Sequence, residues 1–231
     1  MHYYDCPCDE CRRPDNDAIY QRVLHVIERL EQELDQPRTK EYERALQWLA
    51  SVCGGPEAVR TLATAPLCGP VPLPDDARVV EVAGLLAKVT EEFFDAETEL
   101  AFRRGLARVW AHDPGLVTAP VSAAYVAAGV VWAVGEANDI VGVDHRMTAS
   151  RLKYALDTPS MPSTYARPIR KALRGLWEWR VEHGPRAWLA APMPPLSALG
   201  HLDLLTSRTR AQLVRVREHA LAARAEDLAA A

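Results

Sequence analysis

Residues 121–141 read VSAAYVAAGVVWAVGEANDIV, residues 147–156 read MTASRLKYAL, and residues 162–174 read PSTYARPIRKALR. The first segment is apolar almost throughout, which is typical of a helix surrounded by other helices. Its uninterrupted apolar part, residues 120–134, is shorter than the ~20 residues that a helix needs to cross a bilayer. The stretch therefore predicts a buried central helix followed by two shorter helices, of which the second is basic.

The two shorter helices match the requirements of a helix-turn-helix. Such a motif needs apolar and small residues in its first helix and apolar anchors in its second. Leu152, Ala155 and Leu156 meet the first requirement. The anchors of the second helix recur at spacings of three and four: Tyr165 or Ala166, Ile169, Leu173 and Leu176. The sequence therefore predicts a helix-turn-helix over residues 148–176.

The second helix of this motif carries the residues that we expect to contact DNA. Its basic side chains are Arg167, Arg170, Lys171 and Arg174. Arginine pairs bidentately with guanine or with phosphate. Ser163 and Thr164, near the helix start, suit a backbone phosphate because free N–H groups gather there. The same charges would also suit RNA or an acidic protein.

Two features depart from a compact helix-turn-helix. The connection, residues 157–162, is long and contains prolines where a tight turn usually has a glycine. Pro168 lies early in the second helix. If that helix begins at Tyr165 or later, Pro168 is tolerable, whereas a start at Ser163 costs one backbone hydrogen bond.

Residues 91–176 resemble an uncharacterised bacterial family with a cyclin-like, transcription-factor-IIB-like helical fold that ends in a helix-turn-helix. The carriers of the resemblance are residues 91–97 (EEFFDAE), 131–140 (VWAVGEANDI), 147–152 (MTASRL) and 163–170 (STYARPIR). The resemblance implies a compact bundle around the Trp132 helix and a nucleic-acid-binding or transcription-related role. Asn138 matches the family's pattern, and we interpret it as a helix-terminal cap or a buried hydrogen-bonding group rather than a base contact.

The charge distribution fits a local binding patch. The chain has a net charge of −4, yet residues 145–186 contain nine Arg or Lys against three Asp or Glu. A basic patch on an acidic body is one electrostatic signature of a nucleic-acid-binding protein, although it also describes a solvated basic helix. The first residues lack the basic stretch and apolar run of a secretory signal, so we expect a cytoplasmic protein.

Three of the five cysteines lie within six residues, at Cys6, Cys8 and Cys11. Three thiolates on a short loop can bind one tetrahedral zinc ion. His2 is the nearest candidate for the fourth ligand, and His25, Cys53 and Cys68 are alternatives that folding would have to bring in. Free thiols and an iron–sulfur cluster are the other interpretations of this segment.

Helical periodicity along the rest of the chain, without strand-like alternation, predicts an all-α fold. The expected parts are residues 1–65, a Cys-rich start and a helical hairpin; residues 75–183, a cyclin-like bundle containing the helix-turn-helix; and residues 184–231, a helical extension. The Pro-rich residues 66–74 separate the first two. The last helix, expected over residues 206–227, would pack on its own chain or on a second copy.

The chain contains no Walker A, G-x-G-x-x-G, H-E-x-x-H or G-x-S-x-G motif. We therefore expect binding rather than catalysis, and no membrane association. The leading hypothesis is a DNA-binding transcriptional regulator. The alternatives are a protein-interaction module, a homodimer included, and a subunit of a larger nucleoprotein complex.

Overall fold

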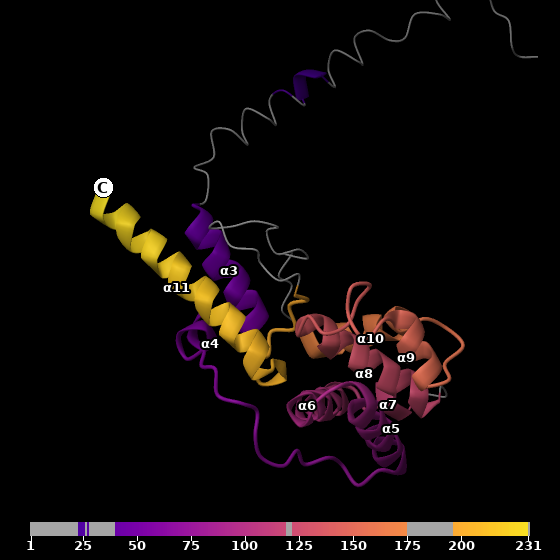
Figure 1. Cartoon of the computed structure of the whole chain (residues 1–231). Coiled ribbons are helices and arrows are strands. Elements are labelled where there is room, and N and C mark those ends of the chain that lie inside the picture. The colour runs from indigo at the N-terminus through magenta and orange to yellow at the C-terminus, as the bar shows by residue number, and fades with distance from the viewer. Residues whose placement is uncertain (1–22, 26, 28–39, 119–121, 175–195, 231) are drawn as a thin grey trace, which may run out of the picture. The chain divides into compact units, whose positions relative to one another are not determined.

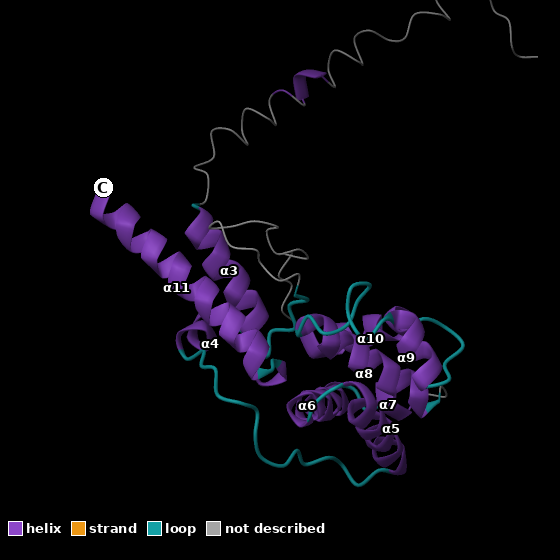
Figure 2. Cartoon of the chain, in the orientation of Figure 1, coloured by secondary structure: helices purple, strands orange, loops and turns teal. Residues whose placement is uncertain are grey.

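The computed structural model describes residues 23–25, 27, 40–118, 122–174 and 196–230. Every regular element in these ranges is helical, apart from an isolated bridge between Val141 and Met147, so the all-α prediction is confirmed for them (Figure 2). Contacts group residues 1–40 into one unit and residues 41–231 into another. The described helices of the larger unit are α3 (Glu41–Cys53), α4 (Pro56–Arg60), α5 (Ala77–Phe93), α6 (Ala96–His112), α7 (Gly115–Thr118), α8 (Ala123–Ala137), α9 (Ala149–Ala155), α10 (Pro162–Arg174) and α11 (Ser207–Ala230), with a 3₁₀ turn, η1, over Leu202–Leu204. None of the helices described is both long and apolar enough to cross a membrane.

Aspartate side chains cap the N-termini of α5 and α6. The Asp76 carboxylate accepts a hydrogen bond from the Arg78 backbone N–H at 2.8 Å, and that of Asp95 accepts one from Thr98 at 2.8 Å. Such caps satisfy backbone N–H groups that have no partner within the helix. Helix α4 has a proline at its first position and ends at Arg60.

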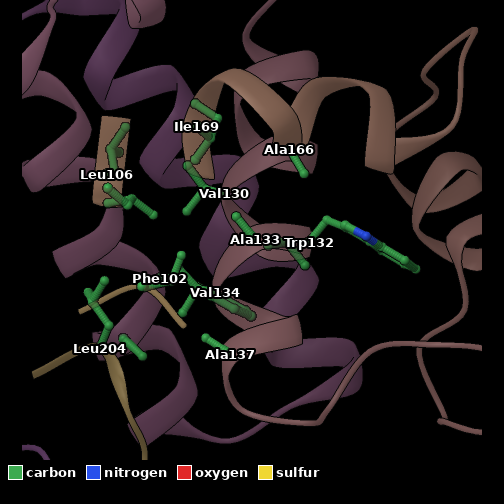
Figure 3. Packing of buried hydrophobic residues seen from close by; sticks show 14 of the residues in the cluster. Phe102, Leu106, Val130, Trp132, Ala133, Val134, Ala137, Ala166, Ile169 and Leu204 are labelled. Atoms are coloured by element: carbon green, nitrogen blue, oxygen red, sulfur yellow. The ribbon is translucent and has the colours of Figure 1, made fainter. Parts of the chain in front are cut away.

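Helix α8 is the centre of the core. It packs against α5, α6 and α10, and twelve of its fifteen residues are buried. Val130 and Val134 face Phe102 and Leu106 of α6 (Figure 3). A Cβ added at Gly105 of α6 would lie 2.9 Å from a Val134 methyl group, so the two helices approach closely at this point. The predicted buried helix is confirmed, over a shorter range than residues 121–141.

Asn138 joins the end of α8 to the C-terminal part of the chain. Its Nδ2 donates to the Val134 carbonyl at 2.9 Å and to the Leu204 carbonyl at 2.8 Å. Its Oδ1 accepts from the Thr206 backbone N–H at 2.7 Å, and the side chain is 3% exposed. The interpretation of Asn138 as a buried hydrogen-bonding group is confirmed.

The last helix, α11, lies beside α3 (Figure 1). Leu213, Val216 and Ala220 are buried. The Tyr42 hydroxyl of α3 donates at 3.0 Å to the carboxylate of Asp227, near the C-terminal end of α11. Of the two alternatives for the last helix, the structure shows packing on its own chain.

The irregular segment between α4 and α5 is held by arginines from two helices. Arg104 of α6 donates to the Cys68 carbonyl at 2.7 Å, and Arg210 of α11 donates to the Ala65 carbonyl. Arg217 donates to the Leu62 carbonyl at 2.9 Å. The Pro-rich segment is irregular. These hydrogen bonds attach it to α6 and α11, and the helices before and after it belong to one unit.

Glu97 of α6 connects that segment to α11. One carboxylate oxygen accepts from the Leu67 and Ser207 backbone N–H groups, each at 2.8 Å, and the other accepts from the Ser207 hydroxyl at 2.6 Å. Burial raises the pKa of Glu97, but these hydrogen bonds and the nearby Arg210 outweigh it and hold the pKa below its ordinary value. The carboxylate thus caps the N-terminus of α11.

Candidate nucleic-acid interface

Helix α9 begins where the sequence places it. The Thr148 hydroxyl accepts from the Arg151 backbone N–H at 3.3 Å and caps the helix. Leu152 is the fully buried residue of α9. Ala149, Lys153 and Ala155 are half-buried, and the remaining three residues of α9 are exposed.

The connection between α9 and α10 is ordered by hydrogen bonds of its own. Asp157 has a φ of 49°, in the left-handed region that glycine usually occupies after a helix. The backbone N–H of Thr158 donates to the Lys153 carbonyl at 3.0 Å, and its hydroxyl donates to the Ser160 carbonyl at 3.2 Å. Asp157 therefore adopts the conformation that a glycine would otherwise supply in this connection.

Helix α10 begins at Pro162, so Pro168 lies inside it. Proline is favoured in the first position of a helix because its missing N–H would have no helical partner there. At position 168 the missing N–H leaves the Thr164 carbonyl without its helical donor. Thr164 and Pro168 are both exposed, so water can solvate the Thr164 carbonyl. The observed start at Pro162 lies nearer to the predicted start at Ser163 than to the one at Tyr165. Pro168 therefore costs α10 one backbone hydrogen bond, as expected for the earlier start.

One side of α10 is fixed on α8. Ala166 and Ile169 face α8 in Figure 3 and are buried. A Cβ added at Gly129 of α8 would lie 2.8 Å from the Tyr165 carbonyl oxygen and 2.9 Å from an Ile169 side-chain carbon. The Tyr125 and Tyr165 rings stack with their centroids 4.4 Å apart. The backbone of α10 therefore lies directly on α8, and its orientation is determined by packing.

The opposite side of α10 is open. Four of the predicted DNA contacts are exposed there, and we call them the exposed face: Ser163, Thr164, Arg167 and Lys171. Residues 163, 167 and 171 follow each other at the four-residue spacing that places side chains on one side of a helix. Arg167 and Lys171 form no hydrogen bond or ion pair with any residue that the structure describes.

The other two predicted contacts are engaged within the fold. The Arg170 guanidinium forms an ion pair with Glu136 of α8, and its side chain is 26% exposed. Arg174 donates from Nε to the Ala198 carbonyl at 2.9 Å. The structure thus divides the four basic residues of α10 into two that are open and two that have protein partners. Sequence spacing gave no signal for this division, because the partners come from residues distant in the chain.

His201 contacts the C-terminal end of α10. Its Nε2 lies 2.6 Å from the Leu173 carbonyl oxygen, which accepts only, so Nε2 carries the proton. Burial and the nearby Arg108 lower the pKa of His201, and the Leu173 and Asp203 contacts offset part of that effect. The imidazole is therefore neutral near pH 7 and satisfies a carbonyl at the helix end.

The predicted zinc ligands Cys6, Cys8, Cys11 and His2 lie outside the described residues. Within the ranges that the structure covers, no three His, Cys, Asp or Glu side chains are grouped so that they could hold a metal ion. Burial raises the pKa of Cys53 to about 12, against the opposing charge of Arg217, so this core residue remains a thiol at neutral pH. Cys68 is exposed.

The chain was compared with protein-family models, with curated proteins and with solved structures, and none of the three comparisons found a match.

Proposed function

We propose that the protein binds DNA, as a transcriptional regulator, through the exposed face of α10. The observation that carries the proposal is a pair of exposed basic side chains, Arg167 and Lys171, on a helix whose other side is packed on α8; neither has a partner among the residues that the structure describes. The backbone of a helix held in this way loses little freedom on binding.

The chemistry of the exposed face suits the phosphate backbone. Arg167 and Lys171 can each neutralise a phosphate and release its condensed counterions. Ser163 and Thr164, in the first turn of α10, add hydroxyl donors that suit a phosphate, whereas the Thr164 backbone N–H already donates to the Met161 carbonyl at 3.0 Å. Arg167 is also able to pair bidentately with guanine in the major groove.

The sequence resemblance described above supports the same interpretation, since it implies a cyclin-like bundle that ends in a helix-turn-helix. The order of α9, an ordered connection and α10 is compatible with that motif. Its connection of six residues is longer than the three or four residues of a compact motif.

The test is a fluorescence-anisotropy titration of the full chain with a labelled random-sequence duplex at several salt concentrations. The variant is Arg167→Ala/Lys171→Ala. We expect it to flatten the slope of log affinity against log salt by roughly two units, at about 0.9 per phosphate contact.

The matched control is Arg208→Ala/Arg215→Ala, which removes the same charge from exposed positions of α11. A slope that falls equally in the control and in the α10 variant would mean that net charge, and not the exposed face, determines binding. Wild-type protein that does not bind the duplex in low salt would refute the proposal.

A protein-interaction module is the second candidate, and exposed apolar side chains favour it. Val143 is 92% exposed, Tyr154 81% and Met161 45%, all between α8 and the start of α10. Such side chains are individually common on surfaces, but together they suit a partner protein. Sedimentation velocity of wild type and Tyr154→Ala at high salt tests self-association: a dimer that Tyr154→Ala dissociates would favour this candidate.

A further inference from the structure

Glu136, the acidic residue of α8, contacts three different groups. One carboxylate oxygen accepts from the Trp132 indole N–H at 2.8 Å, and the other is paired with Arg170. The Glu136 backbone carbonyl accepts from the Ser197 N–H at 3.2 Å. Trp132 is buried and its ring points to the side of α8 opposite Leu106 (Figure 3). The buried Trp132 side chain therefore orients the partly exposed Glu136 carboxylate.

Arg170 borders the exposed face of α10. It follows Arg167 by three residues and precedes Lys171 directly, so its guanidinium extends from the flank next to theirs. Both members of the Arg170–Glu136 pair keep about a quarter of their side-chain surface accessible, 26% and 25%. The ion pair thus lies within reach of a ligand on the exposed face.

A carboxylate and a phosphate are competing acceptors for the same guanidinium. Both accept charge-assisted hydrogen bonds from arginine in a planar geometry. While Glu136 holds Arg170, the charge of the arginine is neutralised, and the carboxylate also repels phosphate.

We infer that Glu136 limits the number of phosphates that α10 engages, because it occupies on Arg170 the place that a DNA phosphate would take. The inference rests on the proposed function. It assigns Glu136 as a residue that lowers the affinity and the salt dependence of binding, and Arg170 as a phosphate ligand that Glu136 keeps occupied.

The test compares wild type with Glu136→Gln in the anisotropy titration. Near 0.1 M salt we expect the variant to bind about five- to tenfold more tightly, and its salt slope to steepen by about one unit, as for one added phosphate contact. Glu226→Gln on α11 makes the same change in net charge at an exposed position and should leave the slope unchanged.

A second variant keeps the net charge constant. In Glu136→Gln/Arg170→Gln both members of the pair become neutral amides, and we expect wild-type affinity and slope. A slope that flattens by one unit in this double variant would show that Arg170 already contacts phosphate in the wild type, and it would overturn the inference.

A measurement without DNA distinguishes failure of this inference from failure of the proposed function. Phenylglyoxal modification, followed by peptide mass spectrometry, should label Arg167 readily and Arg170 slowly in the wild type, and the labelling of Arg170 should rise in Glu136→Gln. Unchanged labelling of Arg170 overturns the inference and leaves the proposed function standing if the Arg167→Ala/Lys171→Ala variant still loses binding. Released Arg170 in a protein that binds no duplex refutes the proposed function, and the inference with it.

Discussion

Helices α8 and α10 pack on each other but use their surfaces differently. Helix α8 is buried almost all round, and its polar groups at the C-terminal end, Glu136 and Asn138, bind other parts of the chain. Helix α10 buries one side, binds partners along one flank and leaves the exposed face open. The difference shows that the number of basic residues in a helix does not tell how many of them can bind a ligand. Other parts of the fold supply ion-pair and hydrogen-bond partners that occupy some of them.

The largest expected effect concerns the C-terminal end of α8. Asn138→Ala removes three buried hydrogen bonds and leaves the Leu204 carbonyl and the Thr206 N–H unpaired. We expect the free energy of unfolding to fall by about 3 kcal/mol, measured by urea denaturation. Gln47→Ala, an exposed amide on α3, should change it by less than about 0.5 kcal/mol. Equal effects in the two variants would contradict the role of Asn138.

The next effect concerns the crossing of α8 and α10. Gly129→Ala places a Cβ 2.8 Å from the Tyr165 carbonyl oxygen, so the helices must separate, and we expect a loss of about 2 kcal/mol. Gly84→Ala in α5 has no atom within 4 Å of its new Cβ and should stabilise the protein by about 0.5–1 kcal/mol. Urea denaturation of both variants gives the comparison, and stabilisation of Gly129→Ala would show that the helices are not in close contact there.

A smaller effect tests the division of charges on α10. Lys171→Ala should lower DNA affinity about five- to tenfold near 0.1 M salt and flatten the slope by about one unit, with unfolding unchanged. Arg174→Ala should do the reverse: it loses the bond to the Ala198 carbonyl, at about 1 kcal/mol, and leaves binding unchanged. DNA titration and urea denaturation of each variant measure the two effects. An equal loss of affinity in both variants would contradict the division of α10 into exposed and engaged basic residues.

The smallest effect is the pH dependence of the C-terminal end of α10. Because the pKa of His201 is lowered in the folded protein, the unfolded chain binds more protons as the pH falls below about 6.5. The contribution of His201 is therefore complete above that pH and is lost as the pH falls toward the folded pKa. His201→Gln keeps an N–H donor but does not titrate.

Thermal unfolding from pH 8 to pH 5 should therefore show a smaller acid-induced fall of Tm in His201→Gln than in the wild type. Glu97 is present in both proteins, so its own acid titration cancels in the difference. Parallel curves for the two proteins would mean that His201 does not contribute.

Local signals in the sequence were sufficient to predict several elements. Asp76 and Asp95 begin helices because a carboxylate can cap backbone N–H groups within three residues of itself, and α8 was recognisable from its unbroken apolar composition. Of the predicted hairpin, the structure describes the helix α3 and, before it, only the helical residues 23–25 and 27. The boundaries at Pro162 and Arg60 were less predictable, since several nearby residues allow a helix to start or end.

The sequence by itself determined that the protein is helical, where its central helix lies, and which residues of α10 are basic. These properties depend on spacing, caps and composition, which act over a few residues. Only the tertiary structure decided that Arg170 and Arg174 have protein partners, while Arg167 and Lys171 are exposed and have none in the described part of the chain. The physical reason is that an ion pair or a hydrogen bond depends on distances between side chains, and Glu136 and Ala198 come within reach of α10 only when the chain folds.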